Sequence, residues 1–295
     1  MSSTTRARGD LRNRRAGRDL RARGRSRGHP MSGLDQAESG YAPGNGLELY
    51  YEVRGAGDPL ILLHGGVTGI VMFGPNLPEL ARGRKLIAVE LQGHGRTADT
   101  DRPMSFEAMA DDVAGLMQHL GIQKADLMGL SLGGGVALQA AFRHPDLVRK
   151  LVVVAAPCKR EGWYPEVRAD FDQMGPAAGE GMKQSPLAQL YPDLDWARLF
   201  GKLGDLLRKD YDWSTQVAAI EAPTMLVYAD ADGVSLAHVV DFFRLLGGGE
   251  RDAGLDGSRR PVSRLAVLPG LTHYTISSDV ALASAVTPFL DAPMP

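Results

Sequence analysis

The chain has 295 residues, of which 44% are hydrophobic, 23% charged and 6% aromatic, and its formal net charge is -2. This composition is typical of a globular protein and argues against a disordered, collagenous or membrane protein. No apolar run reaches the roughly 18 residues that cross a bilayer, so no membrane partner is expected. The single cysteine, Cys158, provides no disulfide framework and fits a reducing compartment, so we expect a cytoplasmic protein.

The near-neutral net charge is the sum over two parts of the chain with opposite charge. Residues 1–30 contain ten arginines against two aspartates, a charge of +8, which leaves 23 basic and 33 acidic residues and a charge of -10 over 31–295. An acidic body is not expected to bind nucleic acid. Residues 1–40 are rich in Arg, Gly and Ser and poor in large apolar side chains, so we predict a disordered arm there.

Two interpretations of this arm remain. It is an electrostatic tether for RNA, DNA or anionic lipid, or it is an upstream extension with Met31 as the true first residue. The second is favoured because the arginines are not interleaved with aromatic residues that could stack on bases. The pair Arg14 and Arg15 resembles a twin-arginine export signal, but no apolar stretch follows it.

From residue 46 the pattern changes to the alternation of apolar and polar residues that marks a half-buried strand, over 47–54. Short continuous apolar runs then follow, as in strands of a parallel sheet that are buried on both faces. These runs are 60–63, 86–89, 127–128, 151–154, 225–228 and 265–268.

Helical patterns separate these runs, most clearly over 106–120, where Ser105 is placed to cap a helix and Gly121 to end it. Alternating strands and helices predict the α/β class, a doubly wound and mostly parallel sheet with helices on both faces. The alternation lapses over 158–220, where eight of the nineteen aromatic residues gather. We predict a helical lid insertion there, between the core segments 41–157 and 221–295.

The sharpest chemical signal is Gly129-Leu130-Ser131-Leu132-Gly133, directly after a predicted strand and before a predicted helix. A tight turn of this kind exposes the serine hydroxyl, and only small residues fit at the flanking positions. The pattern predicts a nucleophile elbow rather than a simple capped helix start, and the backbone N-H of Leu132 at the helix start can face a developing oxyanion.

A serine nucleophile needs a base within hydrogen-bond reach. Three histidines follow Ser131 in the sequence. His144 is placed at a helix end and His238 inside a predicted helix, whereas His273 follows the last predicted strand at its carboxyl end. We therefore predict His273 as the base.

The acid that orients this base is expected after the strand 225–228. Two aspartates, Asp230 and Asp232, compete for that role because both follow the carboxyl end of the strand. The preceding strand offers no alternative acid, since Ala155-Ala156-Pro157 follows it.

Over about 46–292 these residues resemble the α/β-hydrolase family. The resemblance rests on His64-Gly65-Gly66, on Gln92-Gly93-His94-Gly95-Arg96, on the Ser131 elbow, on the acid loop and on the segment 268–273. It implies that the acid is Asp232, three residues after Ala229, with Asp230 shaping the loop. It also implies that Gly66 supplies the second oxyanion-hole N-H and that His64 and His94 are structural.

The chain departs from the family pattern at three positions. Glu90 stands where the family often has Asp, Gln92 where it often has Arg, and Ala229 where it often has Gly. None of the three is expected to take part in the chemistry.

The predicted catalytic triad is Ser131, His273 and Asp232, with an oxyanion hole formed by Gly66 and Leu132. The predicted function is that of a serine esterase, which hydrolyses a carboxylic ester or lactone of a small, mainly apolar molecule through an acyl-enzyme. Aromatic residues of the lid, with Met72 and Phe73 near the oxyanion loop, are expected to line the pocket. No cofactor and no metal is expected, and the expected partner is a small-molecule substrate. The sequence makes no prediction of oligomeric state.

Other functions on the same triad are carbon-carbon bond hydrolysis of a diketone, thioester hydrolysis and cofactor-free perhydrolysis. An Asp nucleophile, as in dehalogenases and epoxide hydrolases of this fold, is disfavoured by Ser131. Two readings lie outside catalysis: a ligand sensor that keeps the triad but signals through its lid, and a tether that acts through the arm.

Overall fold

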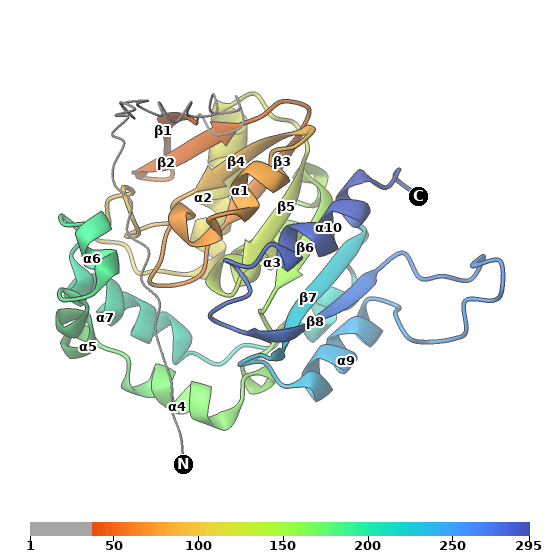
Figure 1. Ribbon diagram of the computed structural model, residues 1–295. Helices are drawn as coiled ribbons and strands as arrows, with labels where there is room; N and C mark the ends of the chain where they lie inside the picture. Colours follow the sequence, from red (N-terminus) through yellow and green to blue (C-terminus); the bar gives the residue numbers. More distant parts are fainter. Residues whose placement is uncertain (1–36) are drawn as a thin grey trace, which may run out of the picture. The chain divides into compact units, whose positions relative to one another are not determined.

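An eight-stranded sheet forms the centre of the computed structural model, which describes residues 37–295 (Figure 1). Its spatial order is β1-β2-β4-β3-β5-β6-β7-β8. β2 runs antiparallel to β1 and β4, and the other pairs are parallel. The strands are β1 (Glu38–Gly44), β2 (Leu47–Arg54), β3 (Asp58–Leu63), β4 (Arg84–Val89), β5 (Ala125–Leu130), β6 (Val148–Val154), β7 (Thr224–Ala231) and β8 (Arg264–Thr272).

Helices cover both faces of the sheet, because successive residues of each central strand point to opposite sides. Ile61 and Leu63 of β3 pack in one buried cluster with α2, α3, α8 and α9, whereas Leu60 and Leu62 pack in a second with α1 and α10. The mostly parallel α/β fold predicted from the sequence is thereby confirmed. These helices are α1 (Asn76–Leu80), α2 (Phe106–His119), α3 (Leu132–Arg143), α8 (Ser214–Ala218), α9 (Leu236–Leu245) and α10 (Ala281–Asp291).

The predicted ends of the helix over 106–120 are confirmed. Ser105 accepts a hydrogen bond from the N-H of Ala108 at 3.0 Å, and Gly121 after the helix has φ +66°. Such a left-handed conformation is typical of the glycine that ends a helix.

The first strand begins earlier than the sequence pattern indicated. β1 starts at Glu38, inside the segment 1–40 that was predicted to be disordered; the rest of that prediction lies outside the described residues, apart from 37. β1 lacks alternating apolar residues and is held by pairing with β2 across Asn45 and Gly46, whose φ angles of +49° and +84° belong to a tight hairpin turn. Gly40 leaves room for Tyr51, whose hydroxyl would lie 2.7 Å from a Cβ at that position.

The segment between β6 and β7 forms five α-helices, four of which gather at one end of the sheet in Figure 1. These are α4 (Pro165–Gln173), α5 (Pro176–Met182), α6 (Pro186–Leu190) and α7 (Trp196–Leu207), with α8 completing the segment. We call residues 158–220 the cap. Lys202 of α7 holds the loop after β4 through an ion pair with Asp99 at 2.8 Å, and Arg198 also contacts Asp99.

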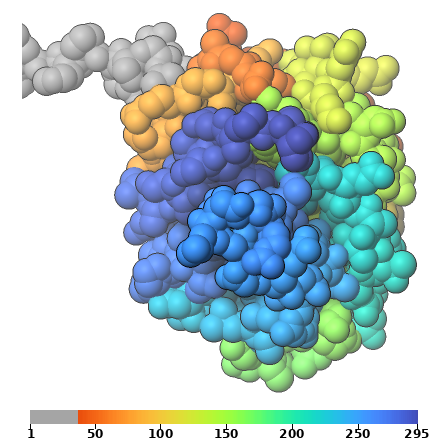
Figure 2. All heavy atoms as spheres, turned by 90° about the vertical axis from the view of Figure 1, so that its right-hand side faces the viewer, coloured from red at the N-terminus to blue at the C-terminus, as the bar shows by residue number. Residues whose placement is uncertain are grey.

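Figure 2 looks onto the right-hand side of Figure 1, where the connection between α9 and β8 lies at the centre of the face, below the C-terminal segment. β8 is the outer strand of the sheet there. No helix within residues 37–295 is long and apolar enough to cross a membrane.

Candidate active site

Ser131 occupies the turn between β5 and α3 with φ +50°, a strained backbone conformation for a residue with a side chain. The flanking glycines make this turn possible. A Cβ on Gly129 would lie 2.0 Å from the carbonyl oxygen of Gly133, and a Cβ on Gly133 would lie 2.5 Å from that of Leu63. Helix and strand therefore approach so closely that larger residues do not fit, and the serine side chain projects above the end of the sheet.

Ser131, His273 and Asp232 form a continuous hydrogen-bonded chain. The distance from Ser131 Oγ to His273 Nε2 is 3.1 Å, and that from His273 Nδ1 to Asp232 Oδ1 is 2.9 Å. The Asp232 side chain is fully buried, and its oxygens also accept from the N-H groups of Ala229 and Val234, each at 3.2 Å. This arrangement suits a carboxylate that orients an imidazole next to a hydroxyl.

The competing acid, Asp230, lies elsewhere. Its carboxylate accepts a hydrogen bond from the N-H of Gly270 at 2.9 Å, across from β7 to β8. The pairing runs from Ala229 opposite Leu268 to Ala231 opposite Thr272, so β8 bulges outward over this span. Asp230 thus holds the bulge that precedes His273.

The other two histidines that follow Ser131 in the sequence contact residues outside the triad. His144 caps the end of α3 and contacts Asp111 at 2.8 Å. His238 lies in α9 and accepts from the N-H of Cys158 at 3.2 Å, and burial lowers its pKa to about 4.

Gly66 and Leu132 lie side by side above the sheet. A Cβ on Gly66 would stand 3.9 Å from the Cβ of Leu132, and both residues line the same pocket as Ser131. The loop of Gly66 is pinned to the start of α3 by a hydrogen bond from the N-H of Gly133 to the carbonyl of His64, at 3.1 Å. Two amides held in this way beside a hydroxyl could bind an oxyanion.

Two buried histidines fix this loop from below. His64 accepts from the N-H of Leu91 at 3.0 Å, and His94 accepts from the N-H of Val67 at 3.1 Å. Each Nδ1 faces a backbone carbonyl, that of Gly65 for His64 and that of Gln92 for His94. Burial lowers the pKa of His64 to about 4 and that of His94 to about 3, so both rings are neutral near pH 7.

Ser131 opens into a cavity of about 280 Å³ between the sheet and the cap. The side chains around it are mainly apolar, and they come from the oxyanion loop, from α2, from α4 and α7 of the cap and from the loop of His273. Met72 is among them, as expected. The expectation for Phe73 is wrong: its ring packs in the core cluster with α1 and α10, because the short helix over 70–73 turns it away from the loop.

Three aromatic residues of the cap reach the cavity, namely Trp163, Phe171 and Tyr211. The ring of Trp163 stands edge-on to His273, with 5.4 Å between ring centroids, and its N-H donates to the Tyr211 hydroxyl at 3.3 Å. Trp196 and Phe200 instead lie buried without lining the cavity.

Glu90, a fully buried departure from the family pattern, joins the core to the cap. Its carboxylate accepts from the Tyr191 hydroxyl at 2.9 Å and forms an ion pair with Arg96 at 2.8 Å. The side chain of Glu is one methylene group longer than that of Asp, and this length lets it reach both groups. Neither Glu90 nor its partners line the cavity at Ser131.

Sequence reasoning missed several cavity residues, among them Asp170 and Tyr274. Val167, Asp170, Phe171 and Met174 all face the cavity at the spacing of one helix face. This helical spacing, directly after Pro165 at the start of a helix, is the sequence pattern from which these cavity residues could have been predicted. Tyr274 follows His273 and is 80% exposed, so no burial pattern marks it.

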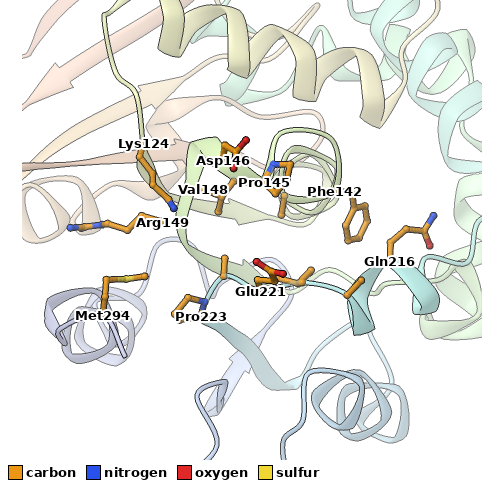
Figure 3. Close-up of a pocket in the computed structure, with 14 residues that line it drawn as sticks. Lys124, Phe142, Pro145, Asp146, Val148, Arg149, Gln216, Glu221, Pro223 and Met294 are labelled. Atoms are coloured by element: carbon orange, nitrogen blue, oxygen red, sulfur yellow. The ribbon is translucent and has the colours of Figure 1, made fainter.

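A second hollow, of about 520 Å³, lies at the opposite edge of the sheet (Figure 3). It is lined by Lys124, Asp146 and Glu221, which precede β5, β6 and β7, and by Arg149 and Met294. It is separate from the residues around Ser131. Within residues 37–295, no group of three or more His, Cys, Asp and Glu side chains is placed to hold a metal ion.

Comparison with known proteins agrees with this fold. A family model for the alpha/beta hydrolase fold matches residues 58–186. AB hydrolase superfamily protein YisY of Bacillus subtilis (strain 168) is 31% identical over 216 residues, which cover 64% of this chain and 80% of that protein. The chain belongs to the α/β-hydrolase family.

Other α/β-hydrolase comparisons are more partial or more distant. The 2-hydroxymuconate semialdehyde hydrolase of Pseudomonas sp. (strain CF600) is 40% identical over 115 residues, 38% of this chain and 41% of that one. The chain spans less than half the length of the first curated relatives that it matches. The solved enol-lactonase of Burkholderia xenovorans LB400 has a TM-score of 0.66 and 21% identity, covering 85% of this chain and 100% of that chain. At that identity the likeness concerns the fold alone.

Proposed function

We propose that this α/β-hydrolase is a serine hydrolase that cleaves a carboxylic ester or lactone through an acyl-enzyme on Ser131. The observation that carries the proposal is the hydrogen-bonded chain from Ser131 through His273 to the buried Asp232, open to a cavity of about 280 Å³. Esters and lactones present a carbonyl with a good leaving oxygen, which suits this group of residues.

In the proposed mechanism His273 takes the proton of Ser131 as the oxygen attacks the carbonyl carbon. Asp232 keeps the Nδ1-H tautomer in place and stabilises the imidazolium. The amides of Gly66 and Leu132 bind the oxyanion. His273 then protonates the leaving oxygen, and after a water molecule enters, the same ring activates it to release the acid.

The substrate class follows from the cavity. Apolar and aromatic side chains surround Ser131, and among the described residues that line the cavity there is no Lys or Arg. We therefore propose a small, mainly apolar substrate, covered by the cap acting as a lid. The cytoplasmic location predicted from the sequence remains a prediction, as do the absence of a cofactor and of a metal.

Carbon-carbon bond hydrolysis is the second candidate, because a partly matching relative is named as a hydrolase of 2-hydroxymuconate semialdehyde. A muconate derivative carries a carboxylate, for which the described cavity residues offer no cationic side chain. Ester hydrolysis is therefore the better supported of the two. Thioester hydrolysis and perhydrolysis would use the same residues.

The deciding experiment compares the purified protein with Ser131→Ala on a short-chain p-nitrophenyl ester. We expect kcat/KM to fall by roughly 10⁴- to 10⁶-fold, since the nucleophile is lost. Ser284→Ala is the matched control, because Ser284 is exposed on α10 and bonds only its own helix. Persistence of most ester hydrolysis in Ser131→Ala would overturn the proposal, and ligand binding without turnover by the unmodified protein would favour a sensor.

A further inference from the structure

Asp170 is a charged residue on an otherwise apolar face. α4 turns Val167, Asp170 and Phe171 toward the cavity of Ser131, at positions one helical turn apart, and Met174 at the end of the helix lines the cavity beside them. Three of these four side chains are apolar. A carboxylate in this stripe is unexpected if the cavity takes only apolar groups.

No cation balances this carboxylate among the described residues. Arg168 lies on α4 but two positions before Asp170, where the two side chains do not face each other, and it forms no ion pair among residues 37–295. Arg160, before α4, pairs with Asp172 at 2.6 Å, and Arg208, after α7, pairs with Asp205 at 2.6 Å. Asp170 has no ion pair within residues 37–295, and neither Lys nor Arg lines the cavity there. The cavity thus combines apolar walls with one acidic group at its cap side.

We infer that Asp170 selects substrates that carry a basic nitrogen, so that the enzyme prefers esters with a cationic group over neutral esters of the same shape and discriminates against carboxylate-bearing ones. The inference rests on the proposed hydrolase function and narrows its substrate class. An ammonium group on the substrate would meet Asp170 on the cap while its carbonyl lies at Ser131. The surrounding Phe171 and Met174 favour a nitrogen that bears alkyl groups, because they offer apolar contact around the charge.

The expected effect is modest, because Asp170 is exposed and water screens its field. We expect roughly a 3- to 10-fold preference in kcat/KM for the cationic ester, as for a partly exposed ion pair. The preference should decrease as the salt concentration rises.

The test uses two matched pairs of esters. One pair carries a trimethylammonium group or its neutral tert-butyl isostere on the acyl chain, and the other carries the same two groups on the alcohol. The ratio of kcat/KM within each pair is measured for the unmodified protein, for Asp170→Asn and for Glu166→Gln. Glu166 lies on α4, is exposed and does not line the cavity. Glu166→Gln therefore removes one negative charge from the same helix, as Asp170→Asn does, without changing the cavity.

We expect Asp170→Asn to lower the cation-to-neutral ratio by roughly 3- to 10-fold in at least one pair, and Glu166→Gln to leave the ratio unchanged. Equal ratios for the unmodified protein and Asp170→Asn in both pairs would overturn the inference, as would an equal effect of Glu166→Gln. Ser131→Ala is run alongside. Loss of all turnover in Ser131→Ala together with unchanged ratios in Asp170→Asn would refute the role of Asp170 alone, whereas surviving turnover in Ser131→Ala would refute the proposed function.

Discussion

The N-H of Val67 donates to Nε2 of His94 across 3.1 Å, and Val67 is held there with φ +65°. A β-branched residue rarely adopts this conformation, and such strain costs about 1 to 3 kcal/mol. The fully buried, neutral ring of His94 therefore stabilises a backbone conformation that the residue itself disfavours. Gly66, the residue directly before Val67, carries an amide that is proposed to bind the oxyanion.

His94 is accordingly expected to act as a positioning residue for the oxyanion loop. In His94→Ala, Val67 loses its partner and the Gly66 amide moves, so kcat should fall by roughly 10- to 100-fold with little change in KM. Steady-state kinetics on a p-nitrophenyl ester measures this split. His119→Ala, at an exposed position at the end of α2, is the control. A change in KM alone would contradict the proposed role.

The two aspartates after β7 should differ sharply when changed. Asp232→Asn leaves the shape intact but cannot stabilise the imidazolium, so turnover should fall by roughly 10²- to 10⁴-fold. Asp230→Asn keeps one oxygen that can accept from the exposed Gly270 N-H and should lower turnover by less than about 10-fold. The comparison is made by kcat on the same ester. Similar losses in both variants would count against Asp232 as the acid.

Glycine at 129 is expected to be irreplaceable for steric reasons. In Gly129→Ala the new methyl group would meet the Gly133 carbonyl oxygen at 2.0 Å, so the free energy of unfolding should fall by roughly 3 kcal/mol or more. Gly181→Ala on α5 meets nothing within 4 Å and should be neutral or stabilising by up to about 1 kcal/mol. Urea unfolding measures both, and a stable Gly129→Ala protein would argue against this turn.

The buried histidines predict how stability depends on pH. The pKa of His64 is lowered by burial from 6.5 to about 4, and that of His94 to about 3. Between pH 6.5 and 4 the unfolded chain therefore binds protons that the folded chain does not, and the free energy of unfolding falls as pH falls. For His64 alone the loss amounts to roughly 3 kcal/mol over this window.

Urea unfolding at several pH values tests this expectation. In the His64→Gln variant the free energy of unfolding should depend less steeply on pH. The difference in slope should correspond to the uptake of up to about one proton fewer on unfolding. Equal slopes for the variant and the unmodified protein would contradict the assignment of a neutral, buried His64.

Much of the fold could be read from the sequence because the central strands are buried on both faces, and continuous apolar runs such as 60–63 mark them. The first strand could not. β1 is an edge strand with small residues, and its pairing with β2 depends on the turn at Asn45 and Gly46 rather than on apolar periodicity. The Asn-Gly pair was the only local sign of it.

The lining of the cavity was predicted least well. Phe73 and Met72 are neighbours in sequence, yet one ring enters the core and the other side chain lines the cavity. Which of two adjacent residues faces a pocket depends on the direction of a single short helix. Residues on the cap, such as Asp170, face Ser131 through contacts between segments far apart in the chain, which local patterns do not encode.

The sequence by itself determined the α/β architecture and singled out Ser131, His273 and a pair of candidate acids, because each stands directly after a strand and the carboxyl ends of parallel strands meet at one edge of the sheet. Its own patterns left Asp230 and Asp232 unresolved. Only the tertiary structure shows Asp232 buried against His273 and Asp230 bound to the amide of Gly270. The physical reason is the bulge in β8, which shifts the register between the two strands and thereby decides which carboxylate meets the imidazole.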